Sequence, residues 1–188
     1  MNVFESHARR YDEWYDRNRE IYERELFTIP KPSSPSLEIG VGTGRFASAL
    51  GIDVGVDISL AMLKIAKSRN VESLLADGRK LPFRNNIFKS VYLIFTLCFL
   101  DSPTEVLAEA KRVLRKDGFM VVCIIPKNSG LGKEYSFRES PFYRIAIFYT
   151  EDEAISMLRR AGFKVMEIRK TFLVHSENDF VCLIAKPQ

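Results

Sequence analysis

Between Ser36 and Pro126 the sequence alternates short, strongly apolar segments with amphipathic ones, and this alternation limits the fold more than any other feature. The apolar segments have the length of buried strands, and those between them have the spacing of helices. Buried strands separated by helices form a mostly parallel sheet with helices on both faces. We therefore predict an α/β fold. The expected strands lie at 36–40, 53–59, 71–78, 89–97 and 119–126, and the expected helices at 45–51, 60–70 and 104–118.

The remaining segments are less regular. From about Phe4 to Phe27 the chain is rich in charged and aromatic residues, and its periodicity predicts one or two amphipathic helices. The residues at helical spacing are Phe4, Tyr11, Trp14 and Tyr15, and then Ile21, Tyr22, Glu25 and Leu26. Residues 127–149 show no clear period and are interpreted as an insertion. A helix is predicted from Thr150, a cap paired with Glu153, to a stop at Gly162. Two strands follow, at 164–170 and 179–186.

The composition is that of one ordinary globular domain. The chain has 188 residues, of which 46% are hydrophobic and 28% charged, with a net charge of +4. This charge is too small to indicate a nucleic-acid partner. The longest apolar run, 91–100, is shorter than the roughly 20 residues that span a bilayer. No signal peptide is evident, and the three cysteines lie in apolar runs, where we expect small buried hydrophobic residues without metal or redox roles. These features predict a cytoplasmic protein.

The first candidate site is the glycine-rich turn between the first strand and the first core helix. It contains Gly40, Gly42 and Gly44, and Glu38 precedes it. Glycine is suited to a sharp turn or to close contact with a ligand, although a tight turn without a ligand also fits. A carboxylate at Glu38 would repel the pyrophosphate of a dinucleotide, which helix amides otherwise attract. It suits a ligand with an ammonium and a sulfonium group, as in S-adenosylmethionine.

Two aspartates follow the next two strands. Asp57 stands where an acidic residue can accept the ribose hydroxyls, about 20 residues after the glycine turn begins. It could instead cap the next helix, but Ser59 is the better cap; the ribose role alone would fit a nicotinamide cofactor equally well. Asp77 and Gly78 could form an ordinary turn or recognise the adenine amino group. Since all three acidic residues end consecutive strands, we expect them at the ligand-binding edge of the sheet.

Several ordered motifs together resemble one family. They are LEIGVGTGRF, GVDISLAMLKIAKSR, ADGRKLPFRNNIFKSVY and EAKRVLRKDGFMVV. This series resembles the class I S-adenosylmethionine-dependent methyltransferases, most of all the branch that includes the ubiquinone and menaquinone biosynthesis enzymes. The resemblance implies a Rossmann-like sheet of seven strands, mostly parallel, with the last strand antiparallel.

The resemblance also implies roles for individual residues. Glu38 and the three glycines Gly40, Gly42 and Gly44 would line the methionine part of the cofactor. Asp57 would bind ribose, Ile58 and Met62 would pack near the adenine, and Asp77 and Gly78 would recognise its edge. Ile94 and Phe95 would lie near the sulfonium.

The sequence departs from many relatives at two places. It has Lys89 where an aspartate is common, and Cys98 and Phe99 where a histidine pair is common. His7 is a candidate in the N-terminal helix, although a surface position is the simpler interpretation, and His175 has no expected role. The catalytic residues therefore remain unassigned, and no metal site is expected.

These observations divide the single domain of residues 1–188 into four parts. Residues 1–30 form an N-terminal lid, 36–126 the cofactor-binding core, 127–149 a substrate-side insertion, and 150–188 a C-terminal helix and strand pair. Tyr11 and Trp14 in the lid would close over the cofactor, or else simply pack against the core. The insertion suits an aromatic or lipid-like acceptor with an acidic group, or else forms an aromatic mini-core with a charged rim. Its relevant residues are Phe137, Phe142, Tyr143, Phe148, Lys133, Arg138 and Arg144.

We accordingly predict a methyltransferase that moves the methyl group of S-adenosylmethionine in line onto a small-molecule acceptor and leaves S-adenosylhomocysteine. The alternative is a non-catalytic S-adenosylmethionine-binding module, acting as a sensor or partner subunit, which the missing histidine pair would favour. A nicotinamide oxidoreductase is a third alternative, opposed by Glu38. The sequence indicates neither the acceptor nor the oligomeric state.

Overall fold

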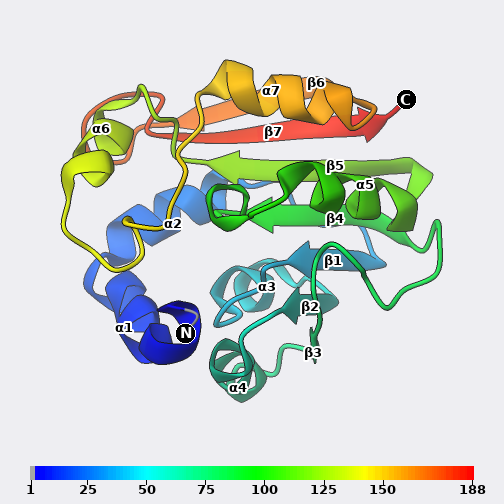
Figure 1. The fold of residues 1–188 in the computed structure, drawn as a ribbon, viewed down its shortest axis with the longest axis horizontal. Helices are drawn as coiled ribbons and strands as arrows, with labels where there is room; N and C mark the ends of the chain where they lie inside the picture. Colours follow the sequence, from blue (N-terminus) through cyan, green and yellow to red (C-terminus); the bar gives the residue numbers. More distant parts are fainter. Residues whose placement is uncertain (1–2) are drawn as a thin grey trace.

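The computed structural model describes residues 3–188; residues 1 and 2, which begin the expected lid, lie outside the described residues. Its centre is a seven-stranded sheet in the order β3-β2-β1-β4-β5-β7-β6 (Figure 1). The strands are β1 (Ser36–Ile39), β2 (Val54–Asp57), β3 (Ser73–Leu75), β4 (Phe88–Ile94), β5 (Leu114–Ile124), β6 (Phe163–Thr171) and β7 (Phe180–Pro187).

The strand directions confirm the predicted fold. The pairs formed by β1, β2, β3, β4 and β5 are parallel, whereas β7 is antiparallel to both of its neighbours, β5 and β6. The last strand in the chain is therefore the one that runs against the others, as the resemblance implied. The consecutive parallel neighbours β1–β2, β2–β3 and β4–β5 are each joined by a crossover that contains a helix, because parallel neighbours need a long connection.

Helices cover both faces of the sheet. The helices are α1 (Val3–Arg17), α2 (Arg19–Thr28), α3 (Arg45–Leu50), α4 (Leu60–Ser68), α5 (Pro103–Val113), α6 (Gly130–Phe137) and α7 (Glu151–Arg160), with a short 3-10 turn, η1, at Leu97–Phe99. In Figure 1, α5 and α7 lie in front of the sheet, and α2 and α3 lie behind it. No helix within residues 3–188 is both long and apolar enough to cross a bilayer.

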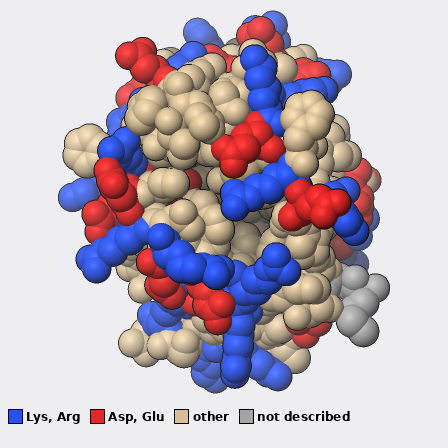
Figure 2. Space-filling view, turned by 90° about the vertical axis from the view of Figure 1, so that its left-hand side faces the viewer, with Lys and Arg blue, Asp and Glu red and all other residues tan. Residues whose placement is uncertain are grey.

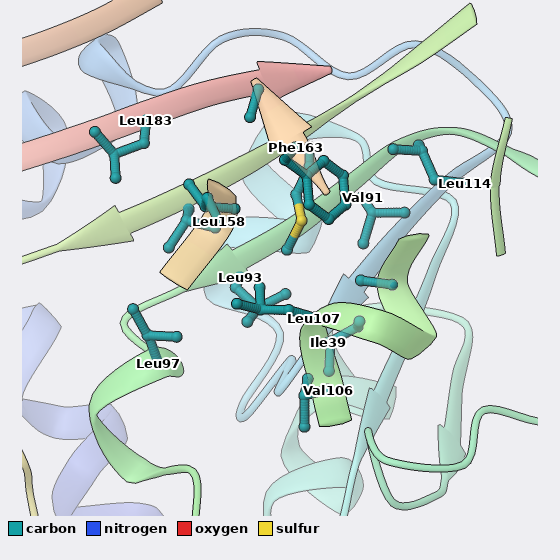
Figure 3. Close-up of a cluster of buried hydrophobic side chains, with 14 of the residues drawn as sticks. Ile39, Val91, Leu93, Leu97, Val106, Leu107, Leu114, Leu158, Phe163 and Leu183 are labelled. Atoms are coloured by element: carbon teal, nitrogen blue, oxygen red, sulfur yellow. The ribbon is translucent and has the colours of Figure 1, made fainter. Parts of the chain in front are cut away.

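The sheet separates two apolar cores. In β4, Val91 and Leu93 enter the core beneath α5 and α7, whereas Tyr92 and Ile94 enter the core on the opposite face. This alternation follows from the two-residue period of a strand. Figure 3 shows the first core, where Val106 and Leu107 of α5 and other labelled side chains meet across the strands.

The predicted helix boundaries hold at three positions. The Ser59 hydroxyl accepts a hydrogen bond from the Met62 amide at the start of α4. Thr150 and Glu153 form a complete capping box at the start of α7. Gly162 adopts φ +80° just after α7, which is the left-handed conformation that commonly ends a helix.

The predicted end of the helix at Gly118 is wrong. Helix α5 ends at Val113, and Leu114 already pairs with Phe88 in the sheet. The register of β5 against β4 then shifts, as in a β-bulge, before Phe119 pairs with Ser90. Val113 and Leu114 are both buried, so tertiary packing ends the helix earlier than its glycine signal suggested. The aperiodic segment 127–149 also contains a short helix, α6.

The cysteine prediction also needs correction. Cys123 of β5 lies directly opposite Cys182 of β7, and the two form a disulfide. All three cysteines lie within residues 3–188, and among them only Cys98 is a free thiol. Two of the three expected small hydrophobic residues are therefore cross-linked, because the sheet register brings together positions that are 59 residues apart.

Asp179, just before β7, holds together the loop that follows β6. This fully buried carboxylate accepts hydrogen bonds from the amides of Leu131, Val174, His175 and Ser176 and from the Ser176 hydroxyl. Burial alone would raise the pKa of Asp179, but these donors outweigh it and hold the pKa well below the usual value. The carboxylate thus joins α6 to the β6–β7 connection.

We expect Asp179→Asn to lower the free energy of unfolding by about 3 kcal/mol at pH 7, because an amide nitrogen would face backbone donors. Since folding lowers the pKa of Asp179, its contribution is complete above the unfolded pKa of about 3.9 and is lost as the pH falls below it. Denaturant unfolding from pH 7 to pH 3 should show the two proteins converging. Asp117→Asn is the matched control, because Asp117 is exposed and its side chain pairs with that of Arg115. Its free energy of unfolding should stay close to that of the wild type. A pH-independent difference would contradict the assignment.

Candidate functional site

The candidate site lies at the edge where the parallel strands end. Strand β1 is flanked by β2 on one side and β4 on the other, so the loops that follow β1 and β4 diverge and leave a crevice. Two cavities open there. The glycine-loop cavity, of about 470 Å³, lies over β1, β2 and the end of β4. The aromatic cavity, of about 550 Å³, lies between α1, α2 and the segment after α6. Figure 2 looks onto this edge and shows a hollow bordered by Lys and Arg side chains.

The two cavities share three lining residues. Tyr11, Phe95 and Phe99 belong to both. These three rings therefore form a common wall, and the two cavities are immediate neighbours. Both volumes are within the range of about 300–1,000 Å³ typical of small-molecule sites.

The glycine loop forms the floor of the glycine-loop cavity. Gly40 adopts φ +75°, and a side chain there would collide with Thr96, which follows β4. Gly42 adopts φ +53°, and the position of its missing Cβ has no atom within 4 Å. The loop backbone is therefore exposed to any ligand in the cavity, as the spacing of the glycines predicted.

Asp57 fastens this loop to β2. Its carboxylate accepts hydrogen bonds from the Gly42 amide at 2.9 Å and the Ser59 amide at 2.8 Å. Burial raises the pKa of Asp57, and the two amides partly oppose that effect. Ser59 is the cap of α4, which leaves Asp57 free to face the cavity, where Ile58 and Met62 also contribute to the wall.

Asp77 and Gly78 form the next part of the wall. Both oxygens of Asp77 interact with Arg79, the shortest distance being 2.6 Å from Oδ2 to Nη2. This hydrogen bond lowers the pKa of Asp77. The pair is half exposed, so a ligand could take the place of Arg79 at little cost. Gly78 lies against β1, where a Cβ would be 2.9 Å from Ile39.

Glu38 lies beneath the loop, outside the lining of the cavity. Its side chain is buried, and its Oε2 atom has no hydrogen-bond partner among residues 3–188. Burial, with a further contribution from Asp57, raises the pKa of Glu38 well above the usual value, although the Ala47 amide partly opposes the shift. The carboxyl group therefore faces α3 rather than the open cavity.

The end of β4 forms the boundary between the cavities. Phe95 adopts φ +57°, which is an unfavourable conformation for a bulky residue and one that concentrates at functional sites. Its amide donates to the Cys123 carbonyl, and the Thr96 hydroxyl donates to the Ile39 carbonyl. Together these bonds hold the turn against β1 and β5, with Ile94 behind it.

Helix α1 covers the crevice and is attached near its start and in its middle. Near its start, Glu5 accepts hydrogen bonds from the Ser59 hydroxyl and the Ala61 amide at the beginning of α4. Farther along, Asp12 lies 2.8 Å from Arg45 and 2.7 Å from Arg69. These bonds place Tyr11 over both cavities.

Ten of the thirteen predicted cofactor residues line the glycine-loop cavity, and three lie elsewhere. Trp14 lines the aromatic cavity only, and Glu38 and Gly44 support the loop from below and behind. The ten are Tyr11, Gly40, Gly42, Asp57, Ile58, Met62, Asp77, Gly78, Ile94 and Phe95. Sequence reasoning missed Arg79, Thr96, Phe99 and Ser102 as wall residues, because all of them follow the strands in turns whose shape the apolar pattern does not specify.

The aromatic cavity contains part of the predicted acceptor region. Phe142, Tyr143, Phe148 and Arg138 line it, whereas Phe137, Lys133 and Arg144 do not. Phe137 is 89% exposed. The walls also include Tyr15, Glu25, Cys98, Tyr135 and Tyr149, which the sequence analysis did not assign. The sequence did contain one signal for Glu25, which is a charged residue on the apolar face of a predicted helix.

Neither histidine reaches the cavities. His7, at a bend in α1, is close to the Val3 carbonyl, and His175 pairs with Glu134. Within residues 3–188 no group of three or more His, Cys, Asp or Glu side chains could hold a metal ion. The site therefore offers carboxylates, aromatic rings and backbone groups for binding.

Comparisons with known proteins agree with this geometry. Residues 37–122 match the family model described as a methyltransferase domain. An uncharacterized protein of Methanocaldococcus jannaschii is 41% identical over 185 residues, covering 96% of this chain and 89% of that protein. A demethylmenaquinone methyltransferase of Corynebacterium kroppenstedtii is 34% identical over 121 residues, covering 60% of this chain and 53% of that one. The menaquinone branch named by the resemblance is thus among its relatives.

A solved structure covers the whole chain. It is a Thermotoga maritima S-adenosylmethionine-dependent methyltransferase, described as a possible histamine N-methyltransferase. It superimposes with a TM-score of 0.89 and 32% identity over 99% of both chains. With the fold, the glycine loop and these relatives in agreement, the chain belongs to the S-adenosylmethionine-dependent methyltransferases.

Proposed function

We propose that this enzyme transfers a methyl group in line to a small molecule held in the aromatic cavity, with S-adenosylmethionine held in the glycine-loop cavity. The observation that carries the proposal is the wall of Tyr11, Phe95 and Phe99 that the two neighbouring cavities share. A binding module that acted only as a sensor would need the first cavity but not the second. The proposed lid, core and insertion correspond to the elements that form these walls.

The residues of the glycine-loop cavity suit this cofactor. The open position at Gly42 leaves room for a ligand against the backbone, and Asp57 and Asp77 supply acceptors for hydroxyl and amino groups. The buried carboxyl group of Glu38 lies below the loop, where a cationic ligand would favour its ionised form and a pyrophosphate would oppose it. Met62 and Ile58 supply an apolar wall for a purine ring.

When bound, the cofactor supplies a methyl group on a cationic sulfur, which is already electrophilic. The chain's own task is then to position the acceptor and to exclude water. Alignment of two reactants can account for about 7–11 kcal/mol of a barrier. Phe95, Phe99 and Tyr11 would form the dry passage between the two partners, so that activity does not require a histidine base for an acceptor that is already nucleophilic.

Asp57 provides the sharpest test of the cofactor site. Asp57→Asn should weaken S-adenosylmethionine binding by about tenfold or more, because the amide both loses an acceptor for ribose and disturbs the bond to Gly42. Isothermal titration calorimetry measures the affinity. Asp53→Asn is the control: Asp53 also accepts backbone and hydroxyl hydrogen bonds from Ser36, but at the opposite end of β2. Equal affinities in the two variants would refute the assignment.

Tyr11 tests the lid. Tyr11→Ala should lower cofactor affinity by about tenfold, because it removes the ring that covers the cavity, whereas Tyr11→Phe should retain most of it. The phenylalanine variant loses only the hydroxyl contact with Tyr15, at 3.0 Å. Titration of both variants with S-adenosylhomocysteine separates the ring from the hydroxyl. If Tyr11→Ala binds like the wild type, α1 has no covering role.

A further inference from the structure

The unusual group in the aromatic cavity is the carboxyl of Glu25. It projects from the middle of α2 into the cavity wall, and the residue is 2% exposed. Its Oε2 atom accepts no hydrogen bond from residues 3–188. Burial without a compensating donor raises the pKa of Glu25 well above the usual value. A buried carboxyl without a partner is costly, and such groups ordinarily coordinate, pair or bind something.

Packing alone does not explain this residue. Glu25 lies on the face of α2 that also carries Ile21, Tyr22 and Leu26, which pack against the second core. An apolar side chain of similar size would fill the same space without the desolvation cost. The carboxyl group therefore destabilises the protein without a ligand. A ligand that donates a hydrogen bond to it would offset this desolvation cost.

The surroundings of Glu25 favour a cation. Half of the residues that line the cavity are aromatic, and two of them, Tyr135 and Tyr143, stack with centroids 4.4 Å apart. Ring faces attract ammonium groups. An ammonium group against these faces would favour the ionised form of Glu25, which would then accept a charge-assisted hydrogen bond from it, whereas an anionic ligand would oppose that ionisation.

The other charged residues of the cavity do not compete for Glu25. Arg10, Arg17, Arg138 and Glu139 line it too, but all four are exposed residues and therefore belong to its mouth. Arg138 lies 3.6 Å from Glu134. The cavity thus has a mixed, solvated mouth and a single acidic group at depth.

We propose that Glu25 anchors a protonated amine of the methyl acceptor within the aromatic cavity. This inference rests on the proposed function. A nitrogen held as a cation has no free electron pair, so the methylated atom is a second nucleophile of the same molecule, nearer the passage at Phe95 and Phe99. The acceptor class is a small compound with one basic nitrogen and one further nucleophilic atom.

The test uses three probes with one carbon skeleton: 2-phenylethylamine, 2-phenylethanol and phenylacetate. Each is titrated calorimetrically into the protein saturated with S-adenosylhomocysteine. The wild type should bind the amine about thirtyfold more tightly than the alcohol, and phenylacetate most weakly. Glu25→Gln should remove the preference for the amine while leaving the affinity for the alcohol unchanged. Glu23→Gln changes an exposed residue of the same helix that pairs with Arg19 and lines neither cavity, and it should leave all three affinities as in the wild type.

Two outcomes overturn the inference: a wild type that binds the alcohol or phenylacetate as tightly as the amine, and a Glu25→Gln protein that keeps the preference. Thermal unfolding verifies that Glu25→Gln folds. If that variant does not fold, the ranking of the three probes on the wild type still tests the inference. Binding of S-adenosylhomocysteine is measured first. Its absence would contradict the proposed function itself, whereas its presence without a preference for the amine would contradict only the role of Glu25.

Discussion

The contact between Gly40 and Thr96 is the constraint on which the site depends. These residues follow β1 and β4, the two neighbouring strands whose outgoing loops diverge. Gly40 has no side chain, so Thr96 can approach the loop closely enough to donate to the carbonyl of Ile39. This approach closes the base of the crevice and turns Phe95 outward into the boundary between two cavities. Without it, the glycine loop and the end of β4 would no longer share a wall.

The second cavity depends on segments that are distant in the sequence. Helices α1 and α2 come from the first 28 residues, and the opposite wall comes from the segment after α6. Ring contacts join them, with Tyr11 and Phe142 at a centroid distance of 5.5 Å. The core of the sheet thus supplies most of the wall of the glycine-loop cavity, whereas the two less regular segments supply most of the wall of the aromatic cavity. This division explains how relatives that share the core can differ in the molecules that they accept.

Local signals predicted the core of the fold well. A few neighbouring residues are enough to predict each apolar strand, the glycine turn and the capping box at Thr150. The errors arose where distant contacts decide the outcome: burial of Leu114 ends α5 before its glycine, and sheet register pairs Cys123 with Cys182. Among the site residues, Asp57 and Gly42 were predictable because strand ends carry ligands. The place of Glu25 in the site was not predictable, because it depends on a cavity whose walls come from four separate segments.

The attachments of α1 have a consequence for turnover. Glu5 ties its beginning to α4, and Asp12 ties its middle to Arg45 and Arg69 across the glycine loop. Release of a product from beneath α1 would require these bonds to open. The paired side chains of Asp12, Arg45 and Arg69 are only 12–24% exposed, so added salt screens them weakly, and we expect α1 to keep its hold on the glycine loop over a wide range of ionic strength.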